Sequence, residues 1–303
     1  MSRISETTRY EVCGLTIDSP IELPGLITSD NEPDIVIRYT REPLRLPSPT
    51  IRGVLYVADA SGCLITAPGA ARYLVEDGRR ILVEPLDGAP PESVRLFLLG
   101  AALGMALCQR QLLVWHASAV TGPDGRAVVL AGHSGRGKST LTAALLRQGY
   151  RMLADDLVVV TDGHDGRPHV QRAFPRLKLR EDAVARLGID ARSLPQVRPG
   201  IRKFFVPADG AFADAAAPLR CVYVLDYRSA DAITITPVSG HERLSLLRPY
   251  LFAQKYVEHR GIHLSQFPIF SKAVTSAPVR VLSRRPHAPV DAVVAALQDD
   301  LAS

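Results

Sequence analysis

The chain has 303 residues but only four cysteines, and none of them forms the C-x-x-C pair typical of zinc binding or redox exchange. Cys13, Cys63, Cys108 and Cys221 are widely scattered, which predicts reduced packing residues. The start, MSRISETTRYEV, lacks the basic end followed by an apolar run that marks a secretory signal. We therefore expect a cytoplasmic protein.

Long hydrophobic runs are also missing. The longest uncharged apolar stretch, Leu96 to Cys108, is shorter than the ~20 residues that span a bilayer, so it predicts a buried helix and no membrane partner. No repeat period, low-complexity tract or interleaving of aromatic and basic residues occurs, which argues against solenoids, disordered tails and nucleic-acid binding. The formal charge of +5 favours an anionic ligand.

The chain is longer than most domains built around a single hydrophobic core, which favours two domains. The first ninety residues alternate β-rich runs with turn signals, and Asp77-Gly78 predicts a tight hairpin because both residues tolerate positive φ angles. At Pro90-Pro91 the pattern changes to a long apolar helix over residues 92–111. We place a small β-rich domain at 1–90 and a second domain at 91–303.

The second domain contains a glycine-rich loop, GHSGRGKST, between a short buried strand at 127–131 and a helix that Gly149 stops. Glycines let successive backbone N–H groups point at phosphate oxygens, and the N-terminus of the helix adds positive charge. The order of strand, loop and helix is the one that phosphate binding requires. The predicted nucleotide-binding residues are Gly132, His133, Ser134, Gly135, Arg136, Gly137, Lys138, Ser139 and Thr140.

Within this loop Lys138 would bridge the β- and γ-phosphates, and Ser139 would hold Mg²⁺. Phosphoryl transfer to a hydroxyl also needs a carboxylate for the metal and a base for the proton. Asp155 and Asp156 follow in the apolar run RMLADDLVVV. Adjacent residues on a strand point to opposite faces, which favours a division between proton acceptor and metal ligand.

His116 ends another apolar run, LLVWH, just ahead of the loop's strand; taken alone, such a histidine is more often a hydrogen-bonded core residue. Together, His116-Ala-Ser-Ala-Val, GHSGRGKST and Leu153-Ala-Asp-Asp-Leu resemble, in order and spacing, the catalytic domain of the HPr kinase/phosphorylase family. The resemblance spans about residues 92–200. The opening YEVCGLTIDSPIELPGL is similar to the start of HPr-kinase-related proteins encoded beside modified peptides.

The resemblance implies an α/β kinase domain with a mixed sheet and a phosphate loop, related to phosphoenolpyruvate carboxykinase and preceded here by the β-rich domain. It implies that Asp155 accepts the hydroxyl proton, that Asp156 joins Ser139 in holding Mg²⁺, and that His116 lies beside these carboxylates. ATP is the expected nucleotide, with GTP and a homo-oligomer left open.

One departure from the family concerns the acceptor. The family's E-I-R-G-L-G signature is absent, and the corresponding stretch is FPRLKLREDAV, which directs the expected acceptor away from HPr itself. The chain most resembles kinases that phosphorylate a serine of lasso-peptide precursors.

Ten basic and three acidic residues lie between Arg167 and Lys203, a local excess that fits a triphosphate or an acidic peptide. We select Lys178, Arg180 and Lys203 as side chains directed inward. Residues 251–270 are a candidate acceptor groove, and the apolar stripe of 290–301 predicts a C-terminal helix docked on the core.

The leading hypothesis is a Mg-dependent kinase of a serine or threonine hydroxyl on a peptide. Two alternatives stay open, namely a kinase of a small hydroxylated metabolite and a nucleotide-dependent peptide-binding module without catalysis.

Overall fold

The computed structural model describes residues 6–198, 200–208, 210–228 and 232–303. Its contacts divide the chain into two compact units. The first combines Met1–Val114 with Phe252–Gln266, and the second combines Trp115–Leu251 with Phe267–Ser303. The contacts thus place the division at Val114 instead of near residue 90, and they assign a short later segment to the first unit.

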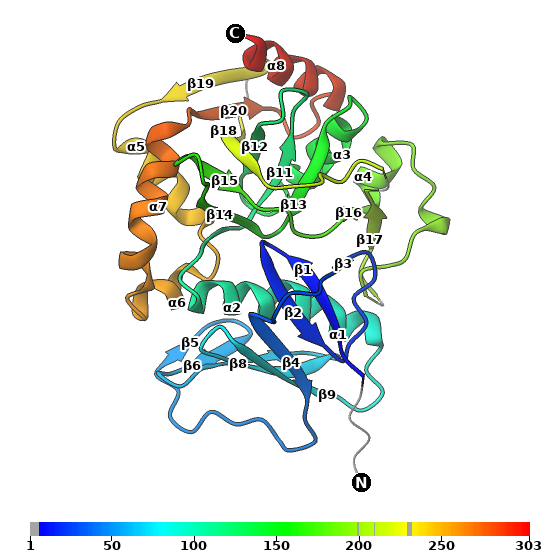
Figure 1. The fold of residues 1–303 in the computed structure, drawn as a ribbon. Helices are drawn as coiled ribbons and strands as arrows, with labels where there is room; N and C mark the ends of the chain where they lie inside the picture. Colours follow the sequence, from blue (N-terminus) through cyan, green and yellow to red (C-terminus); the bar gives the residue numbers. More distant parts are fainter. Residues whose placement is uncertain (1–5, 199, 209, 229–231) are drawn as a thin grey trace. The chain divides into compact units, whose positions relative to one another are not determined.

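The first unit is built on a nine-stranded sheet with the order β3-β1-β2-β4-β9-β8-β7-β6-β5, drawn in blue and cyan in Figure 1. The pairs β2–β4 and β4–β9 are parallel and the other pairs are antiparallel, so the sheet is mixed. The strands are β1 (Thr8–Val12), β2 (Leu15–Ser19), β3 (Ile27–Thr28), β4 (Ile35–Tyr39), β5 (Ile51–Arg52), β6 (Tyr56–Ala58), β7 (Cys63–Ala67), β8 (Ala71–Glu76) and β9 (Arg80–Pro85).

The hairpin predicted at Asp77-Gly78 is confirmed. It joins β8 to β9, which pair antiparallel from Ala71↔Pro85 to Glu76↔Arg80. Asp77 and Gly78 have φ angles of 52° and 65°, and the Arg79 amide donates to the Glu76 carbonyl at 3.0 Å. Two positive φ angles closed by this hydrogen bond are what a type I′ turn requires, and this turn matches the twist of the paired strands.

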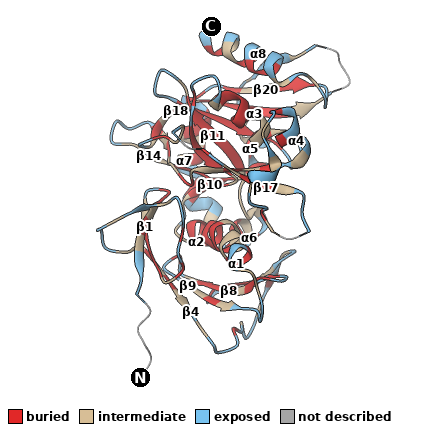
Figure 2. Ribbon diagram, turned by 90° about the vertical axis from the view of Figure 1, so that its right-hand side faces the viewer, coloured by how far each residue is buried: buried red, intermediate tan, exposed pale blue. Residues whose placement is uncertain are grey.

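The helix expected over 92–111 is a continuous helical segment, Pro91–Gln109, made of α1 (Pro91–Phe97), a π-helical turn (Leu98–Ala102) and α2 (Leu103–Gln109). By length and composition it is the one helix among the described residues apolar enough to cross a membrane, but 61% of its most apolar window is buried within the protein. Figure 2 shows α2 largely in the red of buried residues. The Tyr73 hydroxyl on β8 donates to the Val94 carbonyl at 2.8 Å, which fixes this helix to the sheet. It is therefore a core helix of the first unit.

The second unit contains another mixed sheet, with the order β10-β14-β15-β18-β12-β11-β13 and with β20 and β19 beyond β18. Strand β12 runs parallel to β18, and β18 runs parallel to β20, whereas β11 is antiparallel to both β12 and β13. The strands are β10 (Leu113–Trp115), of which only Trp115 is assigned to the second unit, β11 (Ala117–Thr121), β12 (Ala127–Ala131), β13 (Arg151–Asp155), β14 (Val158–Asp162), β15 (Pro168–Val170), β18 (Ala217–Tyr227), β19 (Thr234–Val238) and β20 (Val279–Arg284).

A two-stranded ribbon of β16 (Arg176–Arg180) and β17 (Lys203–Pro207) accompanies this sheet. The helices after the first unit's core helix are α3 (Lys138–Leu146), α4 (Glu181–Arg186), α5 (Glu242–Leu247), α6 (Gln254–His259), α7 (Ile262–Ser276) and α8 (Val290–Ala302), with short 3₁₀ turns at Ala191–Ser193 and Arg248–Tyr250. The mixed α/β architecture agrees with the expected fold class at this level.

The main core of the second unit lies where α3 and α8 pack on its sheet. Val293, Val294, Leu297 and Leu301 of α8 are buried in one cluster with Leu141 and its neighbours on α3. The apolar stripe predicted for the C-terminal helix is therefore confirmed. Burial of these side chains holds α3 firmly on β12, and this fixes the loop that joins them.

All four cysteines are free and buried, as expected for packing residues. Burial raises the pKa of each thiol to about 12. The thiols therefore stay protonated at neutral pH and are poor nucleophiles.

Candidate functional site

The glycine-rich loop leaves the end of β12 and enters α3, as the sequence predicts. Gly135 and Gly137 have φ angles of 83° and 82°, a region that side chains rarely adopt. A Cβ atom at Gly137 would lie 2.6 Å from Nη2 of Arg284, and one at Gly132 would lie 3.1 Å from the Leu225 carbonyl. The absence of a side chain at Gly137 and Gly132 therefore lets Arg284 and Leu225 pack closely against the loop.

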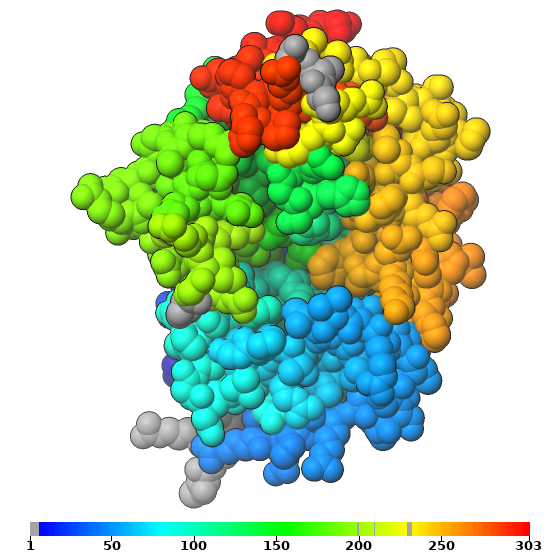
Figure 3. All heavy atoms as spheres, turned by 180° about the vertical axis from the view of Figure 1, so that it is seen from behind, coloured from blue at the N-terminus to red at the C-terminus, as the bar shows by residue number. Residues whose placement is uncertain are grey.

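The tip of the loop is open to solvent. His133, Ser134 and Gly135 are exposed, whereas the glycines at either end are less so. In Figure 3 the green segment of the chain that includes the loop reaches the surface, next to yellow and orange-red segments of the same unit. Backbone N–H groups at this tip are accessible to an anion.

Lys138 is the first residue of α3, and only 7% of it is exposed. Its Nζ donates to the Gly132 carbonyl at 2.7 Å, so the side chain folds back across the loop. Burial lowers the pKa of Lys138, and the nearby Asp156 and Asp155 carboxylates oppose that shift. The ammonium is therefore held inside the loop by its hydrogen bond to the Gly132 carbonyl.

Asp155 is the last residue of β13 and is 3% exposed. Its Oδ1 accepts hydrogen bonds from Ser118 Oγ at 2.6 Å and from Ser139 Oγ at 2.9 Å, and its Oδ2 accepts one from the Lys178 amide at 3.1 Å. Burial, followed by the neighbouring Asp156 charge, raises the pKa of this carboxyl. A fixed, buried carboxylate thus touches the first turn of the helix that follows the loop.

Asp156 leaves the strand in a left-handed conformation, with φ at 72°. This conformation breaks the strand alternation directly after Asp155, as a bend between the two carboxylates requires. Its Oδ2 lies 2.8 Å from Lys178 Nζ, and the two side chains are 25% and 19% exposed. Burial acts to raise the pKa of Asp156, but Lys178, His116 and Lys203 outweigh it and lower the pKa well below its usual range.

Lys178, which lies on β16, therefore contacts both carboxylates, with its amide on Asp155 and its ammonium on Asp156. Lys203 lies on β17 of the same ribbon and acts on Asp156 through its charge. Arg180 does not join them, because its side chain is 76% exposed and pairs with Asp182. Of the three basic residues selected from the sequence, two thus belong to the site and Arg180 does not.

His116 follows β10 and is partly buried. Its Nδ1 lies 3.2 Å from the backbone carbonyl of Asp156. Because a carbonyl only accepts, Nδ1 carries the proton and Nε2 keeps a free electron pair. Burial is the main reason that the pKa of His116 is lowered, so the ring is neutral at neutral pH. The structure thus brings the histidine, the loop and the aspartate pair together.

Sequence reasoning missed two residues that support the loop. The Tyr227 hydroxyl donates to the Gly135 carbonyl at 3.1 Å, and Arg284 Nη2 donates to the Arg136 carbonyl at 2.9 Å. The guanidinium groups of Arg136 and Arg284 lie 4.8 and 5.0 Å from the centre of the Tyr227 ring. Nothing in the local sequence marks these residues, since they come from the ends of β18 and β20, far along the chain.

Three other predicted binding residues lie in the loop or in the first turn of α3. The His133 ring is 5.2 Å from that of Tyr250 at a tilted angle, and Thr140 is partly buried in the first turn of α3. Ser134 is exposed at the loop tip. Their assignment to nucleotide binding stays a prediction.

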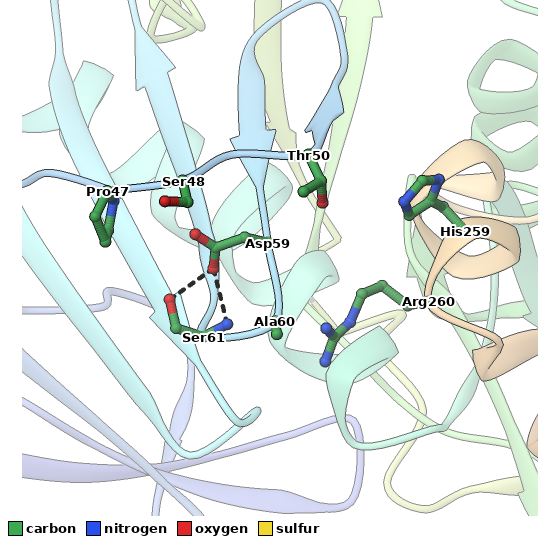
Figure 4. A pocket seen from close by; sticks show the side chains of 8 residues that line it. All are labelled: Pro47, Ser48, Thr50, Asp59, Ala60, Ser61, His259 and Arg260. Carbon is green, nitrogen blue, oxygen red and sulfur yellow. Dashed lines mark hydrogen bonds between the residues drawn. The ribbon is translucent and has the colours of Figure 1, made fainter.

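The segment chosen as an acceptor groove, 251–270, divides between the two units. Its residues His259 and Arg260 line a pocket of about 590 Å³ within the first unit, together with Pro47, Ser48, Thr50, Asp59, Ala60 and Ser61. Figure 4 shows Asp59 turned toward Ser61, which donates to its carboxylate through both N–H and hydroxyl. Tyr256 is buried and lines a smaller pocket of about 180 Å³ in the same unit. The acceptor role of this segment stays a prediction.

The donor set suits a magnesium ion better than a softer metal. Ser139 Oγ and the Asp155 and Asp156 carboxylates are hard oxygen ligands, and Mg²⁺ is commonly held by one or two such groups plus phosphates. Among the described residues no cluster of three or more His, Cys, Asp or Glu side chains forms a self-sufficient metal cage. The residues therefore fit an ion that arrives with a nucleotide.

No family model matches the chain, and no curated protein matches it. Among solved structures, the chain is similar to the Hpr(Ser) kinase/phosphatase from Coxiella burnetii, at 10% sequence identity. The similarity covers 62% of this chain and 96% of that one, with a TM-score of 0.34. At this level of similarity, the function has to be argued from the site itself.

Proposed function

We propose that the protein is a Mg-dependent kinase that transfers the γ-phosphoryl group of ATP to a serine or threonine hydroxyl of a peptide. One observation carries the proposal, namely the buried Asp155 carboxylate held by Ser118 and by Ser139 of the loop helix. A protein that only senses a nucleotide has no need of a second carboxylate and a neutral histidine at this place.

In the proposed reaction the acceptor hydroxyl oxygen attacks the γ-phosphorus, the bond to the β-phosphate oxygen breaks, and ADP leaves. The hydroxyl proton passes to Asp155, whose raised pKa suits a base better than an ordinary carboxylate does. Lys138 and the loop amides bind the phosphates. His116, held by the Asp156 carbonyl, orients the acceptor through its free Nε2.

Asp156 and Ser139 would hold the magnesium ion. When bound, Mg²⁺ neutralises phosphate charge and draws electrons from the γ-phosphorus. Asp156 suits this part because its lowered pKa keeps it ionised, and Lys178 supplies the positive charge that stabilises it before the ion arrives.

We propose as acceptor a ribosomally made precursor peptide of the lasso type. The basic excess over 167–203 supports an acidic peptide, and the resemblance of the opening residues to kinases encoded beside such peptides supports the class. Lys178 and Lys203 of this basic stretch already lie at the carboxylate pair.

The test is incubation of the pure protein with Mg-ATP and serine-containing peptides, read by the mass gain of one phosphate. Asp155→Asn is expected to lower the turnover about 10²- to 10⁴-fold while ATP binding stays within a few-fold, because a base has been removed. Asp162→Asn, at an exposed position on the same sheet, serves as the matched control. Unchanged turnover in Asp155→Asn would show that Asp155 is not the base.

The same assay decides the acceptor class. A pool of free amino acids and sugars is offered in parallel with the peptides. Phosphate on a metabolite and not on any peptide would overturn the peptide half of the proposal and leave the kinase half standing. Peptide affinity that changes with ATP, with no phosphorylated product, would overturn both halves in favour of a binding module.

A further inference from the structure

A pocket of about 830 Å³ lies beside the loop within the second unit. Its walls come from the end of β18, from Ile233 just before β19, and from the turn between β20 and α8. Its volume lies within the range of small-molecule sites. The lining residues are Tyr227, Arg228, Ile233, Arg285, Pro286, His287, Ala288, Pro289 and Ala292.

The pocket is attached to the loop through one of its own walls. Tyr227 lines the pocket and also donates its hydroxyl proton to the Gly135 carbonyl. The amide of the next lining residue, Arg228, donates to the Arg284 carbonyl at 3.0 Å, and the Arg284 side chain reaches the Arg136 carbonyl. A ligand on the loop tip therefore has this pocket as its neighbour.

The chemistry of the walls fits a flat, weakly polar group attached to an anion. Proline, alanine and isoleucine side chains supply apolar surface, and Arg228, Arg285 and His287 supply polar groups. None of the described lining residues is acidic, so nothing there repels a phosphate ester. Buried Arg284, between the pocket and the loop, has an Nε without a hydrogen-bond partner among the described residues. A nucleotide oxygen is the kind of acceptor that such a donor lacks.

We propose that this pocket binds the base and ribose of the nucleotide whose phosphates lie on the loop. The inference rests on the proposed nucleotide-dependent function and deepens it, since it assigns the nucleoside to residues that the phosphate-loop pattern does not include. The loop provides charge recognition and the pocket provides the apolar contact area that distinguishes a nucleotide from inorganic triphosphate.

The experiment compares ATP, GTP and inorganic tripolyphosphate by calorimetric titration in the presence of Mg²⁺. Ala292→Trp, at an exposed position of α8 that lines the pocket, fills part of it with an indole ring. Ala295→Trp is the matched control, because Ala295 is also exposed on the same helix and is not a lining residue. Thermal unfolding of both variants confirms that each is folded.

We expect Ala292→Trp to weaken the binding of ATP or GTP about tenfold or more and to leave tripolyphosphate binding unchanged within about twofold. Ala295→Trp should match the parent protein with every ligand. This split arises because the substitution obstructs only the nucleoside, whereas the loop still binds the phosphates.

Two results distinguish failure of this inference from failure of the proposed function. If the parent binds ATP and tripolyphosphate but Ala292→Trp binds ATP as tightly as Ala295→Trp does, the base lies elsewhere and the kinase proposal stands. If the parent binds neither ligand, the loop is not a nucleotide site, and the inference falls with the proposed function.

Discussion

Lys178 provides the most direct test of the electrostatic argument, because its ammonium is the strongest cationic influence on Asp156. Replacing it by methionine keeps much of the volume of the side chain and removes the charge. At an effective dielectric constant of about 20, two unit charges 2.8 Å apart attract each other by about 6 kcal/mol. The desolvation of both groups offsets much of this attraction.

We expect Lys178→Met to lower the free energy of unfolding by about 2 to 3 kcal/mol at pH 7.5, since an uncompensated carboxylate remains. The figure is below the 3 to 5 kcal/mol of a fully buried pair for two reasons. The side chains are 19% and 25% exposed, and the charge of Lys203 still acts on Asp156.

Urea unfolding followed by tryptophan emission measures this change, because Trp115 is the single tryptophan and lies buried in the second unit. Lys272→Met is the control. Lys272 pairs with Asp162 in the same unit, but both side chains are far more exposed, so the expected loss is only about 0 to 1 kcal/mol.

The pH dependence gives a second readout. The folded pKa of Asp156 is lowered, so its stabilising contribution is fully present above the ordinary carboxyl range and is lost as the pH falls through the folded value. In Lys178→Met the lysine charge no longer opposes the effect of burial, so the pKa of Asp156 is higher than in the parent. As the pH falls, Asp156 of the variant therefore becomes protonated earlier, and the cost of burying its unpaired charge disappears. The difference in stability between parent and variant should therefore narrow from about pH 7.5 to about pH 4.5.

The reasoning is refuted if Lys178→Met costs no more than Lys272→Met, or if the difference from the parent widens as the pH falls. Either result would mean that the ion pair contributes nothing to holding Asp156 ionised in the folded protein.

Two further predictions concern backbone packing and a buried hydroxyl. Gly137→Ala should weaken ATP binding about tenfold or more, because its Cβ would lie 2.6 Å from Arg284 Nη2. The Cβ of Gly135→Ala meets nothing within 4 Å, so this variant should lose less ATP affinity. Fluorescence titration with a labelled nucleotide measures both affinities, and equal losses would contradict the steric reason. Tyr73→Phe should cost the first unit about 0.5 to 1.5 kcal/mol in urea unfolding followed by circular dichroism, because it removes a buried hydrogen bond from the hydroxyl, while the Leu98 amide still donates to the Val94 carbonyl. An unchanged midpoint would show that the hydroxyl contributes nothing to the stability of this unit.

Local patterns predicted the parts of the fold that neighbouring residues determine. Asp77-Gly78 identified a hairpin, and GHSGRGKST identified a loop between strand and helix, because φ preferences act within a few residues. The apolar residues on either side of Asp155 and Asp156 predicted one strand that carries both. The structure instead ends β13 at Asp155 and begins β14 at Val158, because Asp156 adopts a left-handed conformation.

Contacts between distant segments were beyond such patterns. Lys178 was selected for the apolar residues around it, but its position on both aspartates follows from the approach of β16 to the end of β13, which no local signal encodes. The roles of Tyr227 and Arg284 follow from the parallel order β12-β18-β20, in which both strands end beside the loop. Register between strands so far apart is a tertiary property.

The discontinuous make-up of the first unit has a consequence for protein synthesis. Residues 252–266 belong to it, with Gln266 Nε2 donating to the Leu112 carbonyl at 2.6 Å and Gln109 Nε2 donating to the Tyr256 hydroxyl at 3.2 Å. A nascent chain that has just left the ribosome up to residue 114 therefore cannot complete this unit. The surface of α2 that packs against residues 252–266 therefore stays exposed until nearly all strands of the second unit have been translated. An expression plasmid that stops at residue 114 would produce the same unfinished surface permanently.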